Sequence, residues 1–175
     1  MYRPIITGLI SNFMRLIDNF ERDLQKAYNN WVSNLMEAQQ EACQKICEDI
    51  KEQAPVDTGE YKESIKVSET VRLGNIIRTE IYSDYTLDDA NKSDTPTLPE
   101  WANVPLAVLI ESGTRPHIIT PRDPMGTLRW EDEDGIHFAK LVHHTGTAPN
   151  PHWTRAIMEN QAYYRKKMRK ARWKI

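Results

Sequence analysis

The fold is decided by the stretch from Leu9 to Gln53, which reads LISNFMRLIDNFERDLQKAYNNWVSNLMEAQQEACQKICEDIKEQ. It contains no glycine and no proline, and apolar residues recur along it every three or four positions, beginning with Ile10 and Phe13. This spacing is typical of an amphipathic helix. A continuous helix of this length reaches about 65 Å at about 1.5 Å per residue. We therefore expect a helix that either projects from the body of the protein or bends, with Asn29-Asn30 as the expected break.

The apolar stripe of this helix predicts a core or a coiled-coil seam rather than a ligand site. It is longer than one small sheet can cover, and an exposed apolar stripe of that extent normally marks an interface. We therefore expect Leu24, Tyr28, Trp31 and Leu35 to contact other subunits or neighbouring proteins.

The two cysteines of the chain, Cys43 and Cys47, lie four residues apart and so share one face of the predicted helix. We interpret them as buried small apolar residues. A disulfide fits the geometry of a regular helix poorly, and a metal site would need a second pair of cysteine or histidine ligands at the right spacing.

Short strands and turns are expected after the long helix. Pro55 ends the helix at the residue before it, and apolar residues then alternate on both sides of the turn Leu73-Gly74-Asn75. This pattern predicts an antiparallel hairpin. A second hairpin is expected between residues 128 and 142, with its corner at Asp134-Gly135. The apolar run Val104–Ile110 fits either two helical turns or a buried strand.

A second helix is predicted at the end of the chain, from Pro151 or His152 to Arg172. Its inner face is expected to carry Ala156, Ile157, Tyr164 and Met168. The predicted fold is α+β: a long N-terminal helix, an antiparallel sheet of four or five short strands, and a C-terminal helix packed on the sheet.

The length and net charge of the chain are those of a single domain of ordinary size. The chain has 175 residues and a formal net charge of -2, so we expect a single domain over 1–175 with a helical extension (1–30), an acidic loop (84–100) and a basic tail (165–175). No apolar run approaches the length of a membrane span and no signal peptide is evident, which favours synthesis in a cytoplasm.

The residues that usually carry chemistry lack the required spacing. Five histidines are present, but there is no His-Glu-x-x-His motif and no helical pair at ligand spacing. No Gly-x-Ser-x-Gly elbow and no glycine-rich phosphate loop occurs. The sequence therefore predicts no enzyme, no metal and no cofactor. The basic tail leaves one alternative open, a nucleic-acid-binding accessory protein that uses the C-terminal helix.

Three motifs resemble the neck and tail-completion family of tailed bacteriophages. The first is Ala54-Pro55-Val56-Asp57-Thr58-Gly59, the second is Ile110-Glu111-Ser112-Gly113-Thr114 with Arg115-Pro116-His117 after it, and the third is His144-Thr145-Gly146-Thr147-Ala148-Pro149-Asn150-Pro151-His152. The chain departs from the family pattern at Thr145, where proline is usual, and at His152-Trp153, where phenylalanine is usual. The resemblance covers roughly residues 30 to 160.

The resemblance implies a structural virion protein of the head–tail connector that forms a homo-oligomeric ring around the DNA passage. It further implies contacts with a portal-side adaptor or head-closure protein and with a tail terminator or tail tube protein. The motif residues are expected to be structural corners, because glycines and prolines fix backbone geometry and carry no reactive group. These corner residues are Pro55, Asp57, Thr58, Gly59, Glu111, Gly113, Thr114, Pro116, His117, His144, Gly146, Thr147, Pro149, Asn150, Pro151 and Trp153.

Overall fold

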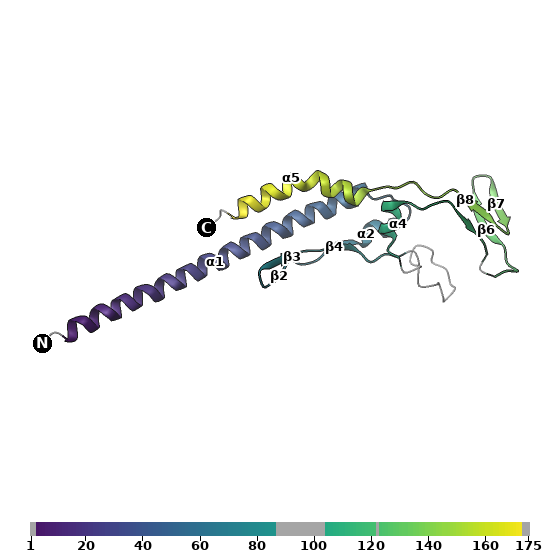
Figure 1. The fold of residues 1–175 in the computed structure, drawn as a ribbon. Coiled ribbons are helices and arrows are strands. Elements are labelled where there is room, and N and C mark those ends of the chain that lie inside the picture. Colours follow the sequence, from purple (N-terminus) through teal and green to yellow (C-terminus); the bar gives the residue numbers. More distant parts are fainter. Residues whose placement is uncertain (1–2, 87–103, 122, 173–175) are drawn as a thin grey trace. The chain divides into compact units, whose positions relative to one another are not determined.

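The computed structural model describes residues 3–86, 104–121 and 123–172, and Figure 1 shows their helices and strands. The fold is α+β, as the sequence predicts. The chain forms two compact units. We call the first the helical unit (Met1–Glu52, Lys66–Tyr82 and Ile157–Ile175) and the second the junction unit (Gln53–Ile65 and Ser83–Ala156).

The long N-terminal helix, α1, is one continuous α-helix from Arg3 to Gln53. The expected break at Asn29-Asn30 is wrong. Asparagine costs only a few tenths of a kcal/mol in a helix interior, and here the Gln25 Nε2 atom donates to the Asn29 Oδ1 atom at 2.9 Å along the helix surface. From Leu9 to Gln53 the helix contains no glycine or proline that would interrupt its backbone hydrogen bonds.

The C-terminal helix, α5, runs from His152 to Arg172 as predicted, and it lies along the C-terminal half of α1 (Figure 1). Asn160 donates to the Asp49 carboxylate at 2.6 Å, and Lys167 forms an ion pair with Glu41. The prediction that this helix packs on a sheet is therefore replaced by packing on α1. The physical reason is area, because strands of three residues offer too little surface to cover a helix of 21 residues.

The expected inner face of α5 is correct only in part. Ala156 is fully buried, and Tyr164 and Met168 are half-buried. Ile157 is 45% exposed, so it does not belong to the inner face.

The hairpin predicted after α1 is confirmed and consists of two antiparallel ladders. Strand β1 (Ile65–Val67) pairs with β4 (Ile81–Ser83), and β2 (Val71–Leu73) pairs with β3 (Ile76–Arg78). Gly74 turns the chain between β2 and β3 with a φ of 63°, a value that glycine adopts without strain.

Two glutamines of α1 hold this hairpin against the helix. The Gln40 Oε1 atom accepts hydrogen bonds from the backbone N–H of Thr70 at 2.7 Å and from its hydroxyl at 2.8 Å. Gln39 is buried and donates to the Thr79 hydroxyl at 3.2 Å. The polar side chains in this interface are therefore paired, as burial requires.

Within its described residues, the junction unit contains two short helices and two further strand pairs. The helices are α2 (Glu60–Ser64) and α4 (Leu106–Ser112), so the apolar run Val104–Ile110 is mainly helical. Strand β5 (His117–Ile119) pairs with β8 (Val142–His144), and β6 (Leu128–Asp132) pairs with β7 (Gly135–Ala139). The second hairpin is thus confirmed, with its corner at Gly135. The strands of the described residues form four separate two-stranded sheets instead of one sheet of four or five.

The core of the helical unit lies on one face of α1 and includes both cysteines. The buried apolar residues of α1 are Val32, Ala38, Ala42, Cys43, Ile46, Cys47 and Ile50. Cys43 and Cys47 form no disulfide, and burial raises the pKa of both thiols. The interpretation of these cysteines as buried apolar residues is therefore confirmed.

Two predicted segments extend beyond the described residues. The acidic loop 84–100 is described only as far as Thr86, and the basic tail 165–175 only as far as Arg172, where it forms the end of α5. Among the described residues, no helix has the apolar length that crossing a bilayer requires.

Candidate functional site

The three corners predicted from the motifs lie together in the junction unit. The first corner precedes α2, the second follows the end of α4, and the third leads into α5. We call the place where the second and third meet, together with Tyr61 of α2, the corner junction.

A two-residue bridge closes the corner junction. Thr114 and Thr147 exchange both backbone hydrogen bonds, at 3.1 and 3.2 Å, and their hydroxyls lie 2.9 Å apart. Gly113 (φ 68°) and Gly146 (φ 83°) precede these threonines. A Cβ atom on Gly113 would overlap the Thr147 carbonyl oxygen, and one on Gly146 would overlap the Thr114 carbonyl oxygen. Both glycines are therefore required by close backbone approach as well as by φ.

Glu111 caps the first turn of α5. One of its carboxylate oxygens accepts the N–H of Trp153 at 3.1 Å, and the other accepts the N–H of Thr154 at 2.9 Å. The first N–H groups of a helix have no partner within the helix, and their dipoles favour negative charge. Glu111, at the end of α4, thus fixes where α5 begins.

His152, Tyr61 and Trp153 form a chain of hydrogen bonds in the interior. His152 is fully buried, and its Nδ1 atom lies 2.9 Å from the Asn150 carbonyl oxygen. Its Nε2 atom lies 2.9 Å from the Tyr61 hydroxyl, and the indole N–H of Trp153 donates to that hydroxyl at 3.0 Å. Burial raises the pKa of Tyr61, so its hydroxyl keeps its proton at neutral pH.

The groups at the two ends of this chain determine the direction of the bonds that they make. A carbonyl oxygen only accepts, so Nδ1 of His152 carries a proton, and in the tautomer with that single proton Nε2 accepts from Tyr61. An indole N–H only donates, so the Tyr61 oxygen accepts from Trp153. All three polar side chains are satisfied in one arrangement, which rigidifies the junction.

The first corner lines a small pocket beside Tyr61. The pocket has a volume of about 180 Å³ and is bounded by Pro55, Val56, Asp57, Thr58, Gly59, Tyr61, Tyr85, Leu106 and Ile110. Gly59 has a φ of 90°, and its carbonyl accepts the N–H of Glu63 at 3.1 Å in the first turn of α2. The corner therefore starts α2 and so places Tyr61.

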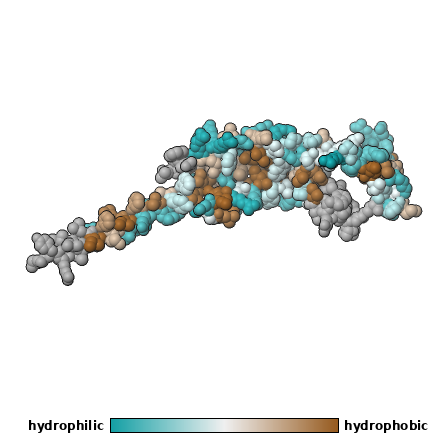
Figure 2. Space-filling view, in the orientation of Figure 1, coloured by the Kyte–Doolittle hydropathy of each residue, from teal (hydrophilic) through white to brown (hydrophobic). Residues whose placement is uncertain are grey.

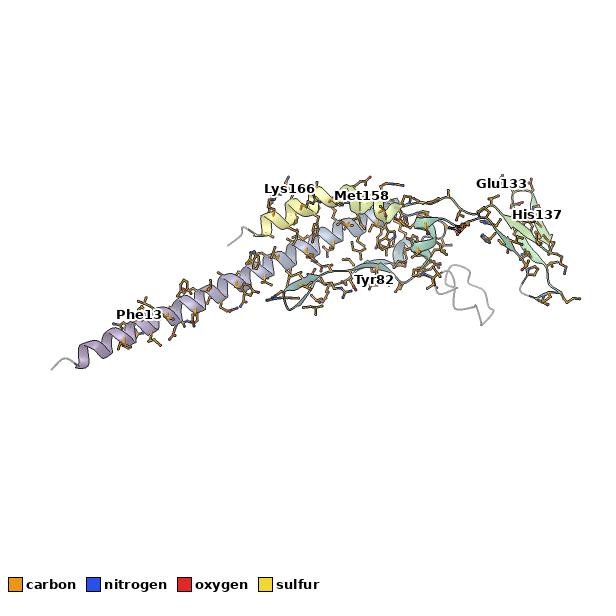
Figure 3. The ribbon with its side chains drawn as sticks, viewed as in Figure 1. Phe13, Tyr82, Glu133, His137, Met158 and Lys166 are labelled. Atoms are coloured by element: carbon orange, nitrogen blue, oxygen red, sulfur yellow. The ribbon has the colours of Figure 1, made fainter. Side chains whose placement is uncertain are left out.

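The remaining histidines do not gather into a ligand set. His117 and His144 face each other across β5 and β8 with ring centroids 4.9 Å apart, and His143 is paired with Ile118. His137 contacts the Asp132 carboxylate at 2.8 Å on the hairpin shown at one end of Figure 3. Within the described parts of the chain, no three His, Cys, Asp or Glu side chains converge on a point.

Two members of the corner junction were absent from the predicted corner residues, namely Tyr61 and His152. Tyr61 follows the first corner by two residues, and His152 ends the third motif. Their position next to the corners is the signal that could have identified them. Pro116 and Pro149 flank the bridge in sequence and are exposed.

The candidate interface residues lie in the helical unit. Leu24 is 59% exposed and Tyr28 is 39% exposed, whereas Trp31 and Leu35 are half-buried. Trp31 and Leu35 line a pocket of about 260 Å³ with Tyr28, Val32, Arg72, Asn75 and Ile77. The Arg72 guanidinium donates to the Tyr28 hydroxyl at 2.7 Å.

The Glu111 cap predicts a specific sensitivity to acid. Partial burial acts to raise the pKa of Glu111, but hydrogen bonds from Thr154 and Trp153 and the proximity of His152 outweigh it, so the pKa lies below its ordinary value. A carboxyl with a lowered pKa stabilises the folded state above its unfolded pKa, near about 4.3, and loses that contribution as the pH falls through the folded pKa.

We therefore expect Glu111→Gln to lower the free energy of unfolding by about 1 kcal/mol at pH 7. The difference from the unsubstituted protein should shrink as the pH falls below about 4.3 and Glu111 becomes protonated. Urea unfolding at pH 7 and at a series of lower pH values measures this, with the exposed Glu133→Gln as the matched control. A difference in unfolding free energy between the two proteins that stays constant with pH would contradict the role of Glu111 as a helix cap.

A comparison against protein families matches one part of the chain. Residues 15–87 match the HK97-gp10-like family model, whose description reads "Bacteriophage HK97-gp10, putative tail-component". Neither a curated protein nor a solved structure matches the chain. The match spans α1 from Arg15, the first corner, α2 and the hairpin β1–β4. This part of the chain is therefore similar to a family that is described as a tail component of phages.

Proposed function

We propose that this chain is a structural protein of the head–tail connector of a tailed bacteriophage. It assembles as a homo-oligomeric ring at the neck and surrounds the passage of the DNA from head to tail. The observation that carries the proposal is the match of residues 15–87 to a phage tail component.

The corner junction supports a framework role. Its residues cap a helix, close a bridge and satisfy one another's hydrogen bonds. Such an arrangement holds backbone geometry, which is what a ring subunit needs when each copy must present the same two faces to its neighbours.

The proposed partners are other copies of the chain, a portal-side adaptor or head-closure protein, and a tail terminator or tail tube protein. Residues with large exposed apolar side chains supply surface for such contacts. In the helical unit they include Ile10, Phe13, Leu24, Val71, Leu73 and Ile76. Exposed apolar surface of this extent on one unit is typical of a protein that works in an assembly.

The alternative of nucleic-acid binding through α5 is weakened by the helical unit itself. Lys167 is paired with Glu41, and the groove that Lys166, Lys167 and Lys170 line also contains Glu37 and Glu41. Acidic side chains within the groove reduce its attraction for phosphates. We therefore retain the connector role as the proposal.

Interruption of the gene in a phage genome tests the proposed function. We expect filled heads and tails to accumulate unjoined, because the part between them is missing, and supply of the intact protein in trans should restore joined particles. Electron microscopy of the lysate gives the numbers of joined particles, free heads and free tails. Joined, infectious particles in its absence would exclude the proposal, and an antibody label along the tail instead of at the neck would exclude the connector position.

A further inference from the structure

The N-terminal half of α1 carries an apolar stripe that, among the described residues of the helical unit, no other element covers from Ile10 to Leu24. Figure 2 shows brown side chains along this half of the helix, and Figure 3 shows Phe13 on it with no other ribbon alongside. The stripe consists of Ile10, Phe13, Met14, Leu16, Ile17, Phe20, Leu24 and Tyr28, each between 37% and 67% exposed. From Ile10 to Tyr28 it extends about 27 Å along the helix axis.

The stripe continues the face of α1 that is covered further along the same helix. Ile10, Ile17, Leu24 and Trp31 follow one another at intervals of seven residues, and Ala38 is the next in this series. Ala38 is buried, and it lines a groove together with residues of α5. Trp31, earlier in the series, lines a pocket with residues of the β2–β3 hairpin. The face is thus covered by this hairpin and by α5 in the C-terminal half of α1 and is open from Ile10 to Leu24.

The width of the stripe indicates more than one neighbouring helix. At about 100° per residue, these side chains fill an arc of about 160°, from Leu16 on one flank to Met14 on the other. The seam of a two-stranded coiled coil is narrower. A helix in a ring of identical helices touches one neighbour on each flank, and apolar side chains on both flanks fit that arrangement.

The charges beside the stripe favour a protein surface over a lipid surface. Helices that lie on membranes carry lysine and arginine on the polar face next to the apolar one. Here Glu21 lies within the arc near its Met14 flank, and Asp18 and Asp23 lie just outside the two flanks. The basic residues occupy the back of the helix: Arg15, Arg22 and Lys26. Acidic flanks would meet anionic headgroups unfavourably.

We infer that the stripe Ile10–Tyr28 is the surface through which copies of this chain contact one another, forming a bundle of their α1 helices. The inference rests on the proposed ring and names the segment that builds it. A stable interface buries about 800 Å² per partner, and Phe or Tyr side chains supply about 150–250 Å² each when buried. Three aromatic and five aliphatic side chains can supply an area of that order.

A matched pair of double variants of the full chain tests this surface. Phe13→Glu with Phe20→Glu places two charges in the stripe, and Asn12→Glu with Asn19→Glu places the same charges on the polar face one residue earlier. We expect the intact protein and the asparagine variant to form multiples of the 20.4 kDa chain mass in light-scattering chromatography. The phenylalanine variant should elute as a monomer with unchanged helical circular dichroism.

Cysteine cross-linking locates the contact without disturbing the fold. In a Cys43→Ala, Cys47→Ala background, Phe20→Cys should form intermolecular disulfides on mild oxidation, and Arg22→Cys, on the back of the helix, should form at least tenfold less. Equal cross-linking at both positions, or a monomeric intact protein, would overturn the inference. Flotation of the uncross-linked protein with anionic phosphatidylserine vesicles would also overturn it, in favour of a lipid surface.

These outcomes are separate from the outcome for the proposed function. An antibody label at the neck combined with no Phe20→Cys cross-link would leave the connector role intact and exclude the stripe. Cross-linking in a protein that is absent from virions would do the opposite.

Discussion

Gly146→Ala is expected to destabilise the protein by about 3 kcal/mol, because two separate costs add at this position. A non-glycine residue in the left-handed region costs about 1–2 kcal/mol, and overpacking adds about 1–3 kcal/mol. The overlap is with the backbone carbonyl of Thr114, which cannot move without breaking its bridge to Thr147. Urea or thermal unfolding measures the loss, and a β-branched residue such as valine should cost more.

Gly74→Ala is the matched control for this experiment. Gly74 has a φ of 63°, but nothing lies within 4 Å of a Cβ placed on it. It should therefore show only the cost of the left-handed conformation, about 1 kcal/mol. If the two variants lose equal stability, close approach at the bridge plays no part and the corner is an ordinary turn.

Tyr61→Phe is expected to cost about 2–3 kcal/mol, although it removes a single oxygen atom. The change leaves the Nε2 atom of fully buried His152 without a donor and the indole N–H of Trp153 without an acceptor. Each buried polar group that loses its partner costs about 1–3 kcal/mol. Equilibrium unfolding in urea gives the value.

Tyr82→Phe supplies the comparison, because Tyr82 lies on β4 with 43% of its surface exposed (Figure 3). We expect it to stay within about 0.5 kcal/mol of the intact protein. A double-mutant cycle with Trp153→Phe should show coupling above about 0.5 kcal/mol. Additive losses in that cycle would mean that the hydrogen-bonded chain does not act as a unit.

The helices and hairpins were predictable because their signals are local. The apolar spacing from Leu9 to Gln53 depends only on neighbours within one or two turns, and the turns at Gly74 and Gly135 follow from adjacent residues. The predicted break at Asn29-Asn30 is wrong because asparagine weakens a helix only slightly. The helical period of the apolar residues continues through these two positions without interruption.

The partners within the site were not predictable from such signals. Glu111 reaches an N–H group 42 residues later, and Tyr61 reaches a histidine 91 residues later. The pairing of β5 with β8 is likewise not adjacent in the chain. The resemblance of the motifs predicts that the corners are structural. Which corner contacts which depends on the tertiary path of the chain, and periodicity carries no information about that path.

The placement of α5 shows the same limit. Its length and start were predicted from Pro151 and the residues after it, yet the surface that receives it was not. The amphipathic pattern of a helix predicts only that an apolar surface covers one of its faces, and it does not identify that surface. The long α1 offers a larger apolar face than any of the four small strand pairs, and this difference in area decides the packing.

The bridge at Thr114 and Thr147 has a consequence for how this protein can diversify. The bridge holds the two ends of residues 115–146 together. These residues contain β5 to β8 and form a closed excursion from the rest of the junction unit. The entropy of closing such an excursion grows slowly, by about 0.6 kcal/mol for each doubling of its length. Insertions or deletions inside it therefore leave the path outside the bridge unchanged. Exchanging this excursion between related chains should transplant its surface while the rest of the junction unit keeps its geometry.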